Sequence, residues 1–174
     1  RDCDGARAPA EGVGAEGKAG TVRGPLHVIP VGEKDISDGA GLPTRCNSNS
    51  RAGIAPATAD AEIVAALRAA GAIMLGKTHT TEFALRDPSP AHNPHNLEHT
   101  PGGSSSGSGA AVAAGMVPVA LGTQTMATAN RPAAYCAIAA STPDSPETPG
   151  ARSVSVYSRG VRVVLCGAPG AGAG

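Results

Sequence analysis

The strongest constraint on the fold of this 174-residue chain is a glycine- and serine-rich loop that leads directly into a helix of small residues. The loop, Gly102–Ser108, reads GGSSSGS, the helix continues to Ala114, and Val117–Leu121 follows as a buried strand. A flexible linker has this composition, but a linker is not flanked at once by packed elements. Glycines and serines before a helix bring hydroxyls and backbone N–H groups together. Such a loop suits a nucleophile relay or an oxyanion site.

Helices and short strands alternate upstream of this loop. From Thr58 or Asp60 the apolar residues recur at helical spacing, and Gly71 is suited to the position just after the helix. Ala72–Leu75 is too short for a helix and predicts a buried strand. Leu26–Val31 is rich in β-formers but contains a proline, which predicts an edge or irregular strand. Helical and strand segments are thus both expected in this part of the chain.

Composition excludes several functional classes. Only 28 of the 174 residues are Leu, Ile, Val or Phe, while 14 basic residues balance 14 acidic ones. Zero net charge and three aromatic residues argue against a nucleic-acid-binding protein. No apolar run approaches the roughly 20 residues that span a bilayer, and the first 20 residues lack the apolar core of a signal peptide. Four widely spaced cysteines read as free thiols, so we expect a cytoplasmic protein without membrane contact.

Gly71–Thr78 matches the phosphate-binding pattern G-x-x-x-x-G-K-[ST]. A true phosphate loop follows a strand and is flexible, whereas here a helix precedes Gly71 and the middle residues are Ala-Ile-Met-Leu. Nucleotide binding is thus a minor alternative. The other interpretation places Lys77 just past the end of a strand, where catalytic side chains often emerge in α/β folds.

Three histidines, His92, His95 and His99, lie in the polar loop from Pro88 to Pro101. Their spacing could present three imidazoles to zinc. The segment offers neither a neighbouring cysteine nor a pair of carboxylates, so solvated loop histidines are favoured and no metal is expected.

The loop and its flanks resemble the amidase signature family. Thr100–Thr125 carries the resemblance most clearly, and Gly24–Pro43 and Ala69–Ala84 look like two further blocks of the same family in the same order. The resemblance covers roughly Gly24 to Cys136, the N-terminal part of such a protein. It implies a truncated α/β/α fold with a mixed sheet that is incomplete at the C-terminal side, because the family's domain needs more chain.

This resemblance also implies a reaction and its residues. Family members hydrolyse or transfer amides by a Ser–cis-Ser–Lys relay. Carried over, it makes Lys77 the general base and Ser104 the bridging serine after a cis peptide bond, and it places Thr128 at the nucleophile position. The backbone N–H groups of Thr125, Met126 and Ala127, with that of Thr128, would bind the oxyanion. A small-molecule amide is the implied substrate, and no metal or organic cofactor is implied.

Several residues depart from the family's pattern. Thr128 replaces a serine, and its β-methyl group crowds the hydroxyl and restricts χ1. Met126 and Ala127 replace two glycines whose backbone freedom the oxyanion loop uses. Glu33 replaces an apolar residue in a buried strand, which risks an unpaired charge. These departures predict weak or no turnover.

The sequence therefore predicts three segments, and two alternative functions are considered for the chain. Residues 1–24 are expected to form a loose arm, 25–143 a partial amidase-signature domain, and 144–174 an unassigned tail rich in Gly, Pro and Ala. The first function is an amidase-type hydrolase of C–N bonds. The alternative is a non-catalytic remnant of such an enzyme, and the nucleotide-binding protein ranks third.

Overall fold

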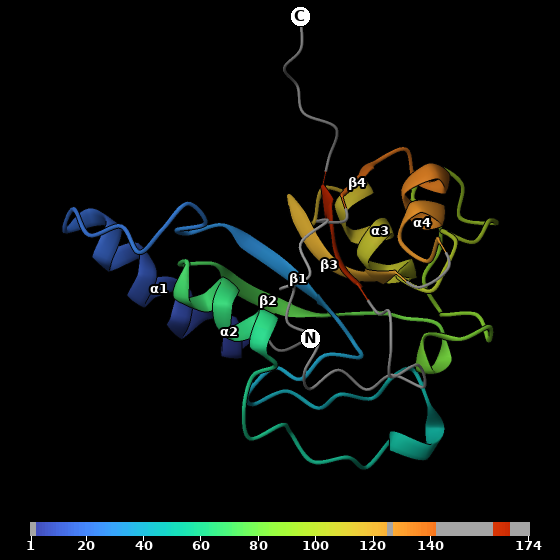
Figure 1. Cartoon of the computed structure of the whole chain (residues 1–174), viewed down its shortest axis with the longest axis horizontal. Coiled ribbons are helices and arrows are strands. Elements are labelled where there is room, and N and C mark those ends of the chain that lie inside the picture. Colours follow the sequence, from blue (N-terminus) through green and yellow to red (C-terminus); the bar gives the residue numbers. More distant parts are fainter. Residues whose placement is uncertain (1–2, 125–126, 142–161, 168–174) are drawn as a thin grey trace, which may run out of the picture.

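The computed structural model describes residues 3–124, 127–141 and 162–167, and within them a five-stranded mixed sheet in the order β2-β1-β3-β5-β4 (Figure 1). β1 (Pro30–Lys34) lies between β2 (Ile73–Thr78) and β3 (Val119–Gln124) and is parallel to both. β5 (Arg162–Gly167) is antiparallel to β3 and to the short strand β4 (Ala139–Ser141). The predicted α/β class with a mixed sheet is confirmed.

Helices pack around this sheet. The described helices are α1 (Cys3–Lys18), α2 (Glu62–Ala69), α3 (Ser106–Ala113) and α4 (Asn130–Tyr135), with 3-10 turns η1 (Asn49–Arg51) and η2 (Glu82–Ala84). The structure differs from the expected loose arm over residues 1–24, because most of that segment is α1. Alanine favours a helix, and α1 lies beside β2 and buries Ala6 and Val13.

The sheet buries a separate apolar cluster on each face. One cluster joins Leu121 of β3 to Val64 and Leu67 of α2. The other joins the neighbouring residue Ala120 to Val112 of α3. Because successive side chains of a strand point to opposite faces, α2 and α3 cover opposite sides of the sheet. Each strand residue near the site therefore faces one helix or the other.

The sequence predicted an edge or irregular strand here: β1 is central rather than at an edge, but its pairing with β2 shifts register between Val31 and Gly32, so it is irregular. Pro30 is the first residue of β1, where its missing N–H group breaks no bond inside the ladder. The strand runs on beyond the predicted end to Glu33 and Lys34, both fully buried. Two ionisable residues thus lie in the middle of the sheet.

The segment that matched the phosphate-loop pattern forms no such loop. Gly71 follows α2 with φ of +92°, as predicted for the residue after a helix, and Ile73–Thr78 is strand β2. Its backbone pairs with β1, and Lys77 stands opposite Glu33 in that pairing. Backbone groups held in a sheet ladder cannot wrap phosphates, so the structure contradicts the nucleotide-binding alternative.

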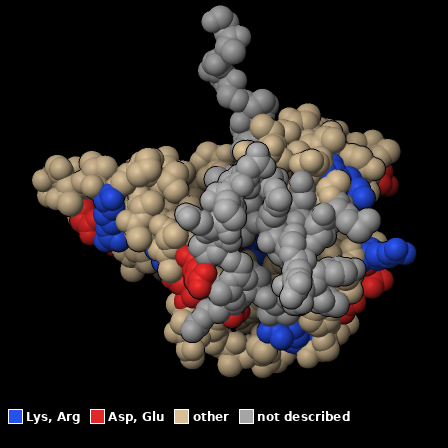
Figure 2. All heavy atoms as spheres, viewed as in Figure 1, with Lys and Arg blue, Asp and Glu red and all other residues tan. Residues whose placement is uncertain are grey.

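The C-terminal region, which the sequence left as an unassigned tail, contributes one described strand, β5, which pairs along the whole of β3. The other residues of 144–174 lie outside the described part of the chain. Among the described residues no helix combines the length and apolar character needed to span a membrane. Acidic and basic side chains are interspersed on the face drawn in Figure 2.

Replacing Gly71 by alanine should destabilise the fold. An L-residue at φ of +92° is strained, and the new Cβ would lie 2.8 Å from the Cα of His27. We expect a loss of about 2 kcal/mol or more in the free energy of unfolding, measured by urea denaturation. Gly53→Ala is the matched control, since a Cβ there meets no atom within 4 Å. Equal stabilities of the two variants would contradict the assigned backbone geometry.

Candidate active site

A buried lysine at the end of β1 meets the start of α3. Lys34 is 0% exposed, and its Nζ donates to the Oγ of Ser104 at 2.8 Å and of Ser105 at 3.0 Å. It also donates to Oγ1 of Thr123 on β3 at 2.7 Å. Strand β1 thus aims an amino group at a cluster of hydroxyls from two other elements. A lysine surrounded by hydroxyl groups can exchange protons with them.

The glycine-rich loop takes its shape from close backbone contacts. The peptide bond between Gly103 and Ser104 is cis, as the family resemblance implied. The Ser104 carbonyl accepts hydrogen bonds from Thr81 N and Thr80 Oγ1, both at 3.1 Å. Gly107 N donates to the His79 carbonyl at 2.8 Å, and a Cβ on Gly107 would lie 2.3 Å from His79 N. Only glycine lets α3 begin this close to the segment after β2.

Lys77 does not reach this hydroxyl cluster, and the predicted assignment of Lys77 as the base therefore needs correction. In the parallel pairing of β1 with β2, Glu33 stands opposite Lys77 and Lys34 opposite Thr78. Thr78 bonds to Ser108 of α3 at 2.8 Å, whereas Lys77 bonds to Glu33 at 2.6 Å. Adjacent strand residues face opposite sides of the sheet, so the two lysines point to opposite faces.

Thr128 lies beside the start of α3. Its carbonyl accepts a hydrogen bond from Ser105 N at 3.2 Å, and its hydroxyl donates to the Thr123 carbonyl at 2.6 Å. The structure thus brings Thr128 next to residues that contact Lys34. Thr125 and Met126, two of the expected oxyanion donors, lie outside the described residues.

Ala127, the third expected donor, adopts a backbone conformation that favours glycine. Its φ is +56°, in the left-handed region. The sequence predicted that a side chain at this position would conflict with the backbone angles of the loop. The chain reaches these angles despite the Cβ, and the conformation costs about 1 kcal/mol relative to glycine.

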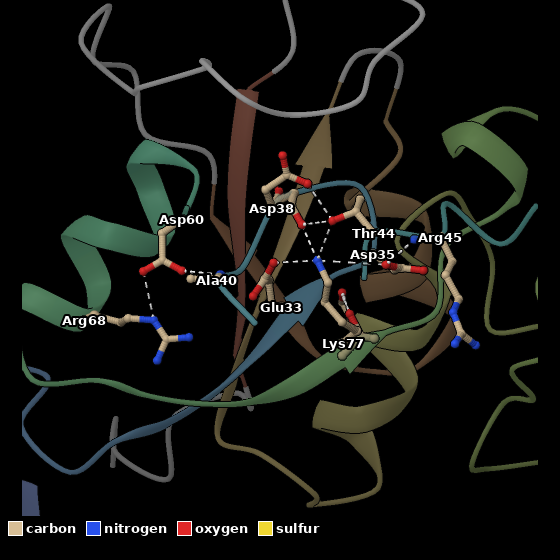
Figure 3. Close-up of polar contacts among 12 residues, drawn as sticks. Glu33, Asp35, Asp38, Ala40, Thr44, Arg45, Asp60, Arg68 and Lys77 are labelled. Carbon is tan, nitrogen blue, oxygen red and sulfur yellow. Dashed lines mark hydrogen bonds and ion pairs between the residues drawn. The ribbon is translucent and has the colours of Figure 1, made fainter. Parts of the chain in front are cut away.

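Glu33 and Lys77 form an ion pair (Figure 3). Because Glu33 and Lys34 are adjacent in β1, this pair lies on the face of the sheet opposite Lys34. Glu33 is 0% exposed, so the predicted risk of a buried charge is real, but Lys77 partners its Oε1. Oε2 has no hydrogen-bond partner among the described residues. Burial raises the pKa of Glu33, against the opposing effect of Lys77. Burial likewise raises the pKa of the neighbouring Asp35.

The loop histidines bond to the backbone. His92 Nδ1 lies 2.7 Å from the Leu97 carbonyl, and His95 Nε2 lies 2.9 Å from the Cys136 carbonyl. His99 lines an open cavity of about 360 Å³. Within the described ranges no cluster of His, Cys, Asp or Glu could hold a metal ion.

The protein thus combines a mixed α/β sheet with a buried lysine that is hydrogen-bonded to two serines at the start of a helix. These features define its class, an α/β protein with a lysine–serine centre. The sequence profile of the family described as Amidase matches residues 1–149. The chain belongs to this family. The match includes residues 1–24, which the sequence assigned to an arm outside the amidase-like part.

Individual relatives agree with this membership. Over 143 residues the chain is 46% identical to a glutamyl-tRNA(Gln) amidotransferase subunit of Roseiflexus castenholzii, a match that covers 79% of this chain and 29% of that protein. A solved amidase superposes with a TM-score of 0.85 at 32% identity, over 94% of this chain and 39% of its own. The peptide amidase of Stenotrophomonas maltophilia gives 0.67 at 40% identity, over 74% and 28%. The chain thus spans about 29% of the length of the amidotransferase protein it matches.

The sequence contains a signal for Lys34 that lies outside the motifs described above. Lys34 lies three residues after the β-rich segment Leu26–Val31 in one of the three family-like blocks, and a fully buried lysine is rare unless its charge is paired. The glycine–lysine pattern around Lys77 drew attention instead. Strand register, which decides which lysine faces the serines, is a tertiary property.

The buried carboxyl group of Glu33 predicts a pH dependence of stability. Because its pKa in the folded protein is raised above the ordinary value of 4.5, folding favours the protonated form. Its contribution is complete below pH 4.5 and is lost as pH rises through the folded pKa. We expect the free energy of unfolding, from urea titrations between pH 4.5 and 7.5, to fall less steeply with rising pH in Glu33→Gln than in the parent. Identical slopes would show that Glu33 is not buried as described.

Ala127→Gly should stabilise the protein. Glycine adopts φ of +56° without a Cβ penalty, and Ala127 is exposed, so no packing is lost. We expect a gain of about 0.5–1 kcal/mol in the free energy of unfolding, after the larger chain entropy of unfolded glycine is subtracted. Ala52→Gly is the control, since Ala52 has φ of −57° and glycine there should destabilise. A loss of stability in Ala127→Gly would refute the left-handed conformation.

Proposed function

We propose that this chain carries out amidase-type chemistry, the hydrolysis of a carboxylic amide C–N bond in a small-molecule substrate. The observation that carries the proposal is the buried Lys34 amino group bonded to Ser104 at 2.8 Å. Membership of the amidase family and the names of the relatives, a peptide amidase and part of an amidotransferase, support the substrate class.

In this proposal a proton passes along three residues. In its neutral form Lys34 keeps two N–H groups for Ser105 and Thr123, and its lone pair takes the hydroxyl proton of Ser104. Ser104 takes the proton of Thr128 as the Thr128 oxygen attacks the amide carbonyl carbon. The C–N bond breaks, and the leaving nitrogen receives the proton back through Ser104. Water then attacks the acyl ester, which releases the carboxylic acid and restores the Thr128 hydroxyl.

Backbone N–H groups around the nucleophile would stabilise the negative charge that develops on the carbonyl oxygen. The proposed donors are those of Thr125, Met126, Ala127 and Thr128. One such donor is typically worth about 10²–10³ in rate. Ala127 keeps a left-handed φ of +56°, a conformation that a non-glycine residue holds where its surroundings impose it.

A second candidate, a non-catalytic remnant of an amidase, has an observation in its favour. The Thr128 hydroxyl donates to the Thr123 carbonyl at 2.6 Å, so it must turn away from that carbonyl before it can pass its proton to Ser104. The β-methyl group of threonine restricts that rotation. A folded domain that binds an amide without cleaving it fits this arrangement.

A covalent fluorophosphonate probe tests the reaction without knowledge of the substrate. We expect slow labelling at Thr128, located by mass spectrometry. Thr128→Ser should accelerate labelling about tenfold, because serine lacks the β-methyl group. Lys34→Met should slow it by about 10² or more, since the relay then lacks its base.

The matched control is Lys18→Met, which removes an exposed lysine of α1 and should leave labelling unchanged. Labelling of Thr128→Ser that survives Lys34→Met would contradict the relay. Absence of labelling in the parent, in Thr128→Ser and in Thr128→Ser with Ala127→Gly would establish the non-catalytic remnant.

A further inference from the structure

The ion pair on the far face of the sheet reaches a loop that directly follows the candidate base. We propose that Lys77 is a positioning residue, which clasps the segment 35–48 to β1 and thereby fixes the backbone that carries Lys34. The part of this inference that concerns catalysis rests on the proposed function. The clasp itself is a statement about structure and is tested without turnover.

The Lys77 ammonium group joins three separate parts of the chain (Figure 3). It donates to Glu33 Oε1 on β1 at 2.6 Å, to the Ser37 carbonyl, and to Thr44 Oγ1 at 3.3 Å. Asp35 Oδ1 lies 3.9 Å away. These contacts use the three protons of the ammonium group. Lys77 therefore ties the loop to the strand as well as neutralising Glu33.

Two further hydrogen bonds hold the ends of the segment 35–48 together. The Thr44 hydroxyl donates to Asp38 Oδ1 at 2.7 Å, and Arg45 N donates to Asp35 Oδ1 at 3.1 Å. The two ends of the segment are thus held near each other around the Lys77 ammonium group. Loss of that group removes a donor from both Ser37 and Thr44.

The clasp is connected to Lys34 through the backbone. The Lys34 carbonyl accepts hydrogen bonds from Ile36 N at 2.7 Å and from Ser37 N at 3.1 Å. Asp35 N donates to the Thr78 carbonyl at 3.0 Å. Because Lys77 holds the Ser37 carbonyl, a displaced segment would move the peptide groups that orient Lys34.

Cys46 reports whether the segment is closed. Its thiol is fully buried, its N–H donates to the Asp35 carbonyl at 3.1 Å, and its carbonyl accepts from Phe83 N at 2.9 Å. Burial raises the pKa of the Cys46 thiol to about 11. Cys136, which is also fully buried, follows α4 in a different part of the fold. The two thiols distinguish local opening of the segment from loss of the whole fold.

The decisive variant is Glu33→Val with Lys77→Met, because it removes the clasp without leaving Glu33 as a buried charge that has lost its partner. The full chain is treated with iodoacetamide and analysed by peptide mass spectrometry. We expect Cys46 to be alkylated at least about tenfold faster than in the parent, while Cys136 stays as slow as before. If Lys77 merely neutralised Glu33, the double variant would keep both thiols equally protected, and the clasp would be refuted.

A second measurement reads the position of Lys34. The protein is treated with acetic anhydride at fixed pH, and the rate of acylation of Lys34 is measured relative to that of the exposed Lys18 in the same digest. In the double variant we expect this relative rate to rise by about fivefold or more. Lys77→Arg keeps a charged donor and should return both rates to within about threefold of the parent. Faster alkylation of Cys46 with unchanged acylation of Lys34 would overturn the positioning role.

These readouts separate the clasp from the proposed function. Thiol alkylation and lysine acylation require no turnover, so an inactive protein gives the same answer. Equal acceleration at Cys46 and Cys136 would mean that the pair supports the whole fold and would overturn the proposal. The two ideas can also fail separately. If Lys34→Met loses fluorophosphonate labelling, the proposed function stands. If the double variant keeps that labelling and its Cys46 stays protected, the clasp is overturned.

Discussion

The site depends on one set of hydrogen bonds, which the buried Lys34 amino group makes to the hydroxyls of Ser104, Ser105 and Thr123. A central strand, a helix start and a third element must approach each other to make it. Burial of an amino group is costly unless its protons are bonded, so these hydroxyls are a condition for β1 to lie where it does. The small side chains of the loop allow these elements to approach each other closely. At Gly107 the approach is so close that a Cβ atom would overlap the backbone of His79.

The two faces of β1 have different electrostatic tasks. On the α3 face Lys34 meets neutral hydroxyls, which can pass a proton. On the α2 face Glu33 meets Lys77, and a buried carboxylate with one unbonded oxygen requires that countercharge. Neighbouring residues thus place a lysine bonded to hydroxyl groups and an ion pair on opposite sides of one strand. A shift of register by one residue would exchange their roles.

Family membership and chemical competence are separate questions for this chain. Lys34 and Ser104 are joined by a buried hydrogen bond, whereas the Thr128 hydroxyl bonds to the Thr123 carbonyl and Ala127 has a strained φ. Strain of this kind persists where the surroundings impose the conformation. The surroundings therefore hold Ala127 in a conformation that alanine itself does not favour.

Local pattern was enough to predict the glycine after α2 and the loop that contains Ser104, and the resemblance to the amidase family predicted the α/β class and the mixed sheet. These depend on hydrophobic spacing, on glycine's freedom at positive φ, and on the ordered blocks of the amidase family. The helix over Cys3–Lys18, the central place of β1 and the choice of Lys34 over Lys77 were decided by the tertiary structure. Each depends on which surface packs against which neighbour, and strand register sets that relation between residues more than forty positions apart.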